Sequence, residues 1–213
     1  MEASTVRHRH AEFDLEVSRR SLGYNLPQRL GRVLWAPMLA MAVMAFAVGV
    51  ILGIVRADEI SSAGATDTIE SLRHVSSGFM AIGFASVFAA ISFAIARILG
   101  QFRKGGGDLQ EATGREVHTL KMPLTAKLFI AVMMMAMMAL VGEAVAHLAF
   151  AADVNATAAS LDLSEERFIV LEGVRRIGVA TYLLAITLGL ATIVTVLRFQ
   201  SIRVRQLPKE PAS

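Results

Sequence analysis

The chain has 213 residues, of which 54% are hydrophobic, a formal net charge of +3 and no cysteine. The absence of cysteine excludes a disulfide framework and a thiolate metal site. The hydrophobic residues are gathered into four blocks of about 20 residues or more, which excludes an ordinary soluble domain and predicts an all-α integral membrane protein.

Residues 1–33 form a polar leader with several arginines and two histidines, His8 and His10. Its later part, residues 13–30, suggests an amphipathic helix lying along the membrane surface, and a solvated tail is the plainer alternative. A long polar leader followed by a long apolar stretch is not typical of a cleaved signal peptide. We therefore expect the first apolar block to remain as a helix.

Four membrane spans are predicted, at about residues 34–56, 74–99, 125–151 and 170–198. Each is long enough to cross about 30 Å of hydrocarbon as a helix, whereas barrel strands would be about half as long and would alternate in polarity. The spans predict a four-transmembrane-helix bundle over residues 34–199, followed by a tail at 200–213. Ser164 is a good N-cap residue, so the fourth helix is expected to begin near it.

The connection between the second and third spans is predicted to be a cytoplasmic loop, residues 100–124. It contains three consecutive glycines, Gly105 to Gly107, which we expect to form a flexible link. The Gly-Lys-Ser/Thr ending of a phosphate-binding loop is missing from this sequence. A nucleotide site is therefore not predicted here.

Positive charge is distributed unevenly along the chain. Arginine and lysine are concentrated in the leader, in residues 97–127 and after residue 197, whereas the connections at 56–73 and 153–167 hold eight carboxylates against three arginines. The positive-inside rule then places both termini in the cytoplasm. We expect a multi-pass protein of a prokaryotic-type inner (plasma) membrane.

Small residues recur at spacings that permit close helix packing. Helices in lipid associate through such residues because hydrophobic burial between them gains little. The predicted helix-packing glycines are Gly49 and Gly53, which form a Gly-x-x-x-Gly pair, together with Gly78, Gly178 and Gly189.

A polar cluster is predicted at the external end of the bundle. Glu143 lies inside the third span, where a carboxylate costs about 2.5–3.5 kcal/mol and needs a partner. His147 follows it at the i+4 position on the same helical face. The other members are Glu70 and His74, at the outer entrance to span two, and Glu172, Arg175 and Arg176, from span four.

Three interpretations of this cluster remain open. Ion pairs between Glu143 and Arg175 or Arg176 could be structural. The residues His74, His147, Glu70 and Glu143 could instead bind a transition metal, or the two histidines could ligate haem b. The arginines could also bind an anionic or quinone-like ligand, or Glu143 could move a proton.

The sequence contains no hydrolase motif such as Gly-x-Ser-x-Gly or His-Glu-x-x-His. The leading hypothesis is a non-enzymatic membrane subunit or accessory protein of a larger complex. Its expected partners are the lipid bilayer and other membrane subunits or further copies of itself, and nucleic acid is not expected. The alternatives are a haem- or metal-binding redox protein and a small oligomeric transporter.

Overall fold

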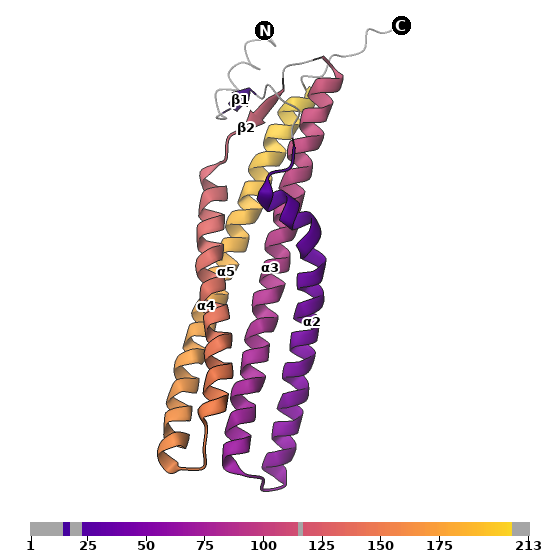
Figure 1. Cartoon of the computed structure of the whole chain (residues 1–213). Coiled ribbons are helices and arrows are strands. Elements are labelled where there is room, and N and C mark those ends of the chain that lie inside the picture. The colour runs from indigo at the N-terminus through magenta and orange to yellow at the C-terminus, as the bar shows by residue number, and fades with distance from the viewer. Residues whose placement is uncertain (1–14, 18–22, 115–116, 206–213) are drawn as a thin grey trace.

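The computed structural model describes residues 15–17, 23–114 and 117–205 (Figure 1). Its four helices are α2 (Leu26–Ser61), α3 (Thr66–Ala112), α4 (Leu124–Asp153) and α5 (Ala158–Arg205). Two short strands, β1 (Leu15–Val17) and β2 (His118–Leu120), pair in antiparallel register. All four helices are long and apolar enough to span a membrane, so the predicted all-helical architecture of four such helices is confirmed.

The helices form two hairpins that lie side by side (Figure 1). Both hairpin turns lie at one end of the bundle, which we call the turn end. The starts of α2 and α4, the ends of α3 and α5, and the strand pair lie at the other, which we call the strand end. Helix α3 packs against the other three helices, and α4 packs against α5, so α2 forms an outer layer on α3.

Helix α2 begins earlier than the first predicted span. Asn25 caps it by accepting a hydrogen bond from the backbone of Gln28, whose side chain accepts one from the backbone of Asn25. This reciprocal pairing satisfies two backbone donors that the helix end would leave free. The predicted surface helix over residues 13–30 is wrong at residues 15–17, which form β1, whereas residues 26–30 are the start of α2. Residues 13–14 and 18–22 lie outside the described residues.

The three glycines at 105–107 lie inside α3, and the predicted flexible link is therefore wrong. A Cβ atom at Gly106 would collide with the side chains of Gln200 and Arg203 from α5. Gln200 Nε2 donates a hydrogen bond to the carbonyl of Phe102 at 2.7 Å. The glycines thus permit close approach of two helices, and the loop predicted for residues 100–124 begins only after Ala112.

The predicted helix-packing glycines all lie close to other helices of the same chain. Cβ atoms built at Gly49 and Gly53 would lie 3.0 Å from Met80 Sδ and 3.8 Å from Ser76 Oγ on α3. Gly78 faces Leu148, Gly178 faces Leu140, and Gly189 faces Ile95 and Phe129. These glycine positions are thus occupied by contacts between the chain's own helices.

The apolar core lies between α3, α4 and α5. The Phe88 and Tyr182 rings stack with centroids 4.1 Å apart, beside the fully buried Leu140. The Tyr182 hydroxyl is 3.1 Å from the hydroxyl of Ser92, which satisfies both groups inside this core. A tightly packed centre of this kind fixes the rotation of each helix, and thereby determines which side chains meet at the turn end.

Candidate functional site

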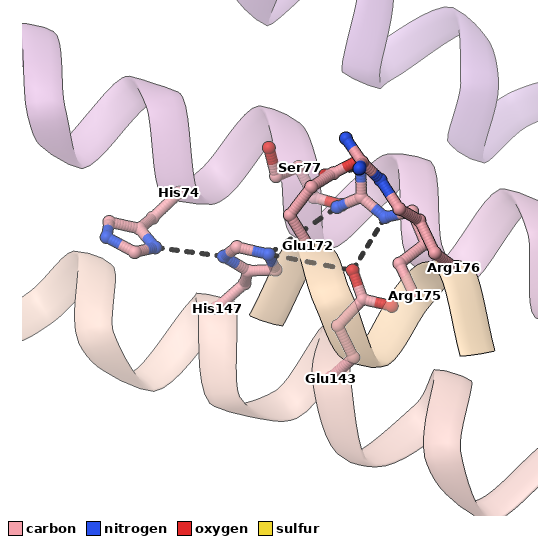
Figure 2. A network of polar contacts seen from close by, with 7 residues as sticks. All are labelled: His74, Ser77, Glu143, His147, Glu172, Arg175 and Arg176. Atoms are coloured by element: carbon pink, nitrogen blue, oxygen red, sulfur yellow. Dashed lines mark hydrogen bonds and ion pairs between the residues drawn. The ribbon is translucent and has the colours of Figure 1, made fainter. Parts of the chain in front are cut away.

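Polar side chains from three helices meet inside the bundle (Figure 2). They lie nearer its turn end, since His74 is close to the start of α3 and Glu143 and His147 are close to the end of α4. His74 comes from α3, Glu143 and His147 come from α4, and Arg175 comes from α5. The relative exposure of the two histidines is 0% and that of Glu143 is 1%. These are among the largest fully buried side chains in the described part of the chain, and buried polar groups require partners.

The two histidines contact each other directly. Their Nδ1 atoms are 2.9 Å apart, a hydrogen-bond distance, so one Nδ1 carries the proton and the other accepts it. His74 Nε2 lies 3.0 Å from the hydroxyl oxygen of Ser164 on α5. The rings of Phe150 and Phe168 surround the pair, with centroids 6.2 and 5.8 Å from that of His74.

Arg175 connects the histidine pair to two carboxylates. Its Nε donates to Glu143 Oε1 at 2.6 Å, and its NH1 donates to Glu172 Oε2 at 2.9 Å. Its NH2 lies 3.3 Å from the carbonyl oxygen of Ser77 and 3.5 Å from His147 Nε2. The remaining oxygen of Glu143, Oε2, is buried without a hydrogen-bond partner among the described residues.

This network accommodates two arrangements of its protons. In the first, Ser164 donates to His74 Nε2, His74 Nδ1–H donates to His147 Nδ1, and His147 Nε2–H faces Glu143 Oε1 at 3.6 Å. In the second, every proton is reversed, and the bare His147 Nε2 accepts from Arg175 instead. Each ring nitrogen therefore faces a polar atom in both arrangements, and the contact between His147 Nε2 and Glu143 Oε1 is the longest of the series at 3.6 Å.

Two of the predicted cluster members lie at its margin. Glu70 pairs with Arg73 at 3.4 Å instead of facing the histidine pair, and Arg73 also binds Glu165 at 2.7 Å. The Arg176 side chain is 79% exposed and contacts Glu172 at 3.7 Å. Arg175, and not Arg176, is therefore the ion-pair partner of Glu143.

The expected N-cap role of Ser164 is wrong. Helix α5 begins six residues earlier, at Ala158, and Ser164 lies inside it with 3% relative exposure. The helical spacing from Ser164 through Phe168 to Arg175 places all three on one face of α5, and this pattern could have predicted the contact. Arg73 and the carbonyl of Ser77 were also missed, the latter because a backbone acceptor leaves no sequence signal.

The geometry of the closed pair does not match that of a metal centre. Two imidazoles on one tetrahedral ion, each about 2.0–2.1 Å from it, would hold their nitrogens about 3.3 Å apart. The observed 2.9 Å is shorter and hydrogen-bonded, and the described residues contain no group of three or more side chains placed to hold a metal ion. Binding of a metal or haem would require the pair to separate, and it stays a prediction.

No family of known proteins matches this chain, and neither the curated proteins nor the solved structures provide a match.

Proposed function

We propose that this chain is a multi-pass protein of the inner (plasma) membrane with its strand end in the cytoplasm. Apolar side chains such as Val43, Ile51 and Leu183 are more than half exposed, as expected for surfaces that face lipid. Basic residues are concentrated in the segments at the strand end, in agreement with the positive-inside rule. At 47 residues, α3 is about 70 Å long and exceeds the roughly 30 Å of hydrocarbon, so part of it extends into water.

Single cysteines test this orientation, because the natural sequence contains none. Gly105 in α3 has open space around it, and Ala156 in the α4–α5 turn is exposed. An impermeant thiol reagent applied to intact cells is expected to label Ala156→Cys and to spare Gly105→Cys. Permeabilised cells, in which both should react, provide the control. The reverse labelling pattern would overturn the orientation.

Within this topology, we propose a non-enzymatic subunit or accessory protein of a larger membrane complex that binds and passes a proton at the His74–His147 pair. The 2.9 Å contact between the two Nδ1 atoms supports this function, since it makes the hydrogen-bonded chain from Ser164 to His147 continuous and leaves His147 Nε2 3.6 Å from Glu143 Oε1. Ionisable side chains are rare within membranes, and those that occur mark proton relays in pumps and transporters. Most of α2 outside its contact with α3 is free to face lipid or partner helices.

An apolar layer lies next to the cluster, on its side toward the strand end. Leu140 precedes Glu143 by one helical turn on α4 and is fully buried beside Tyr182. Such a layer opposes free passage of protons across the bundle. The relay is therefore proposed to exchange protons with only one side of the membrane. This property favours an accessory subunit that binds a proton over the small transporter considered above.

Proton exchange at the ring nitrogens tests the proposed function. In nanodiscs carrying ¹⁵N-histidine, the two Nδ1 nitrogens are expected to show a scalar coupling across their shared hydrogen bond. His74→Gln should abolish this coupling and slow exchange of the His147 N–H with solvent, because an amide does not relay a proton between two nitrogens as an imidazole does. Ser77→Ala, which keeps the carbonyl that accepts from Arg175, should retain both the coupling and the natural exchange. Exchange at His147 that is unaffected by loss of His74 would contradict the proposal.

A further inference from the structure

A pocket of about 290 Å³ lies at the turn end, beside the α4–α5 turn. Its polar lining includes Asn155, Ser160 and Arg167. The Arg167 guanidinium lies 4.3 Å from the centroid of the Phe150 ring and 3.9 Å from Asp153, whose side chain is 68% exposed. A liquid water molecule occupies about 30 Å³, so a polar pocket of this size has room for several.

Two members of the proton relay also line this pocket. They are His74, whose relative exposure is 0%, and Ser164, which retains 3%. The relay's other members, His147 and Glu143, are not among the lining residues and lie farther from the pocket along the cluster. Of the two lining members, Ser164 is therefore the one that solvent in the pocket can reach.

We propose that the pocket is the aqueous entrance through which the relay exchanges protons with the external solution, with the Ser164 hydroxyl as the first carrier. This inference rests on the proposed function. A hydronium ion in the pocket gives its proton to Ser164 Oγ and becomes water, while the original hydroxyl proton moves to His74 Nε2. The proton on His74 Nδ1 passes to His147 Nδ1, and the one on His147 Nε2 passes to Glu143 Oε1. One proton enters, and one carboxylate becomes a carboxylic acid.

Charged groups from all three packed helices surround this path. Helix α3 contributes Glu70 and Arg73, which pair with each other. Helix α4 contributes Glu143, the acceptor, and Asp153 beside the pocket. The charged groups on α5 are Glu165, Arg167, Glu172 and Arg175. When Glu143 is neutralised by the incoming proton, Arg175 still holds its ion pair with Glu172 and can donate to the bare His147 Nε2.

Exchange of the imidazole N–H groups with deuterated solvent tests the entrance. Ala159 lines the pocket without belonging to the relay, so Ala159→Trp should fill the pocket. We expect this variant to slow N–H exchange at His74 and His147 by about tenfold or more, a barrier increase of about 1.4 kcal/mol, while the coupling between the two Nδ1 nitrogens persists. Ala156→Trp, in the α4–α5 turn but outside the pocket lining, should exchange at the natural rate.

Substitutions at Ser164 provide the second test. Ser164→Ala removes the carrier and should slow exchange to a similar extent, whereas Ser164→Thr keeps a hydroxyl and should restore it. Natural exchange rates in both Ala159→Trp and Ser164→Ala, with the coupling between the two Nδ1 nitrogens intact, would overturn the entrance and leave the proposed function standing. Exchange at His147 that does not depend on His74 would instead overturn the proposed function itself. Persistence of the coupling in the variants also shows that they fold.

Discussion

Replacing Arg175 with alanine is expected to destabilise the protein by about 3–5 kcal/mol, because it leaves a buried carboxylate without its cation. Glu143 has 1% relative exposure, and Arg175 Nε donates to it at 2.6 Å. Arg175 also satisfies Glu172 and the carbonyl of Ser77, so three acceptors lose a donor at once. Protonation of Glu143 would offset part of the loss by removing the buried charge. Reversible unfolding in mixed detergent micelles measures the effect.

Arg176 provides a matched control in the neighbouring position. Its side chain is 79% exposed, so Arg176→Ala should change the free energy of unfolding by less than about 0.5 kcal/mol. Combining Glu143→Gln with Arg175→Gln should recover much of the loss, because neither charge then remains unpaired. A double-mutant cycle reports this coupling. Equal effects of the two arginine substitutions would show that the ion pair is not the main source of stability.

Replacing Gly31 with alanine is expected to weaken the packing of α2 on α3 by about 1–3 kcal/mol. The new Cβ would lie 2.5 Å from the carbonyl oxygen of Phe93 and 3.0 Å from the backbone nitrogen of Arg97. Backbone atoms cannot rotate away as the end of a side chain can, so the two helices must separate. The same unfolding assay measures the change.

Other helical glycines separate this steric effect from backbone propensity. Gly142 and Gly173 have open space where a Cβ would be added, so alanine there should stabilise its helix by about 0.5–1 kcal/mol. A Cβ atom at Gly53 would be in ordinary van der Waals contact with Ser76 Oγ at 3.8 Å, so Gly53→Ala should leave the free energy of unfolding nearly unchanged. If Gly31→Ala raised the free energy of unfolding as Gly142→Ala is expected to do, the helices α2 and α3 could not be in close contact at Gly31.

The apolar helices could be predicted from sequence because their length and hydrophobicity are local properties. The need of Glu143 for a partner could also be predicted, since burial of a carboxylate inside a long apolar block is expensive wherever the helix packs. The choice of Arg175 over Arg176 could not, because these neighbours differ by about 100° around the helix and only the packed rotation of α5 decides between them.

The errors in the predicted site came from local patterns that tertiary contacts override. Ser164 has the properties of a helix cap, yet it lies where α5 passes the buried ring of His74. Glu70 lies four residues before His74 on the same helix, but it forms an ion pair with Arg73 instead. The triple glycine has the composition of a linker, and its purpose becomes visible only when Arg203 of α5 is placed against Gly106.

The pairing of β1 with β2 imposes an order on the synthesis of this protein. Val17 pairs with His118, which the ribosome adds about 100 residues later, or roughly 5–20 s at 5–20 residues per second. The first helical hairpin, α2 with α3, is complete before that partner exists. The segment containing β1 must therefore wait unpaired while both of these helices are synthesised. Its pairing then joins the start of the chain to the connection between the hairpins, which makes it a late step of assembly.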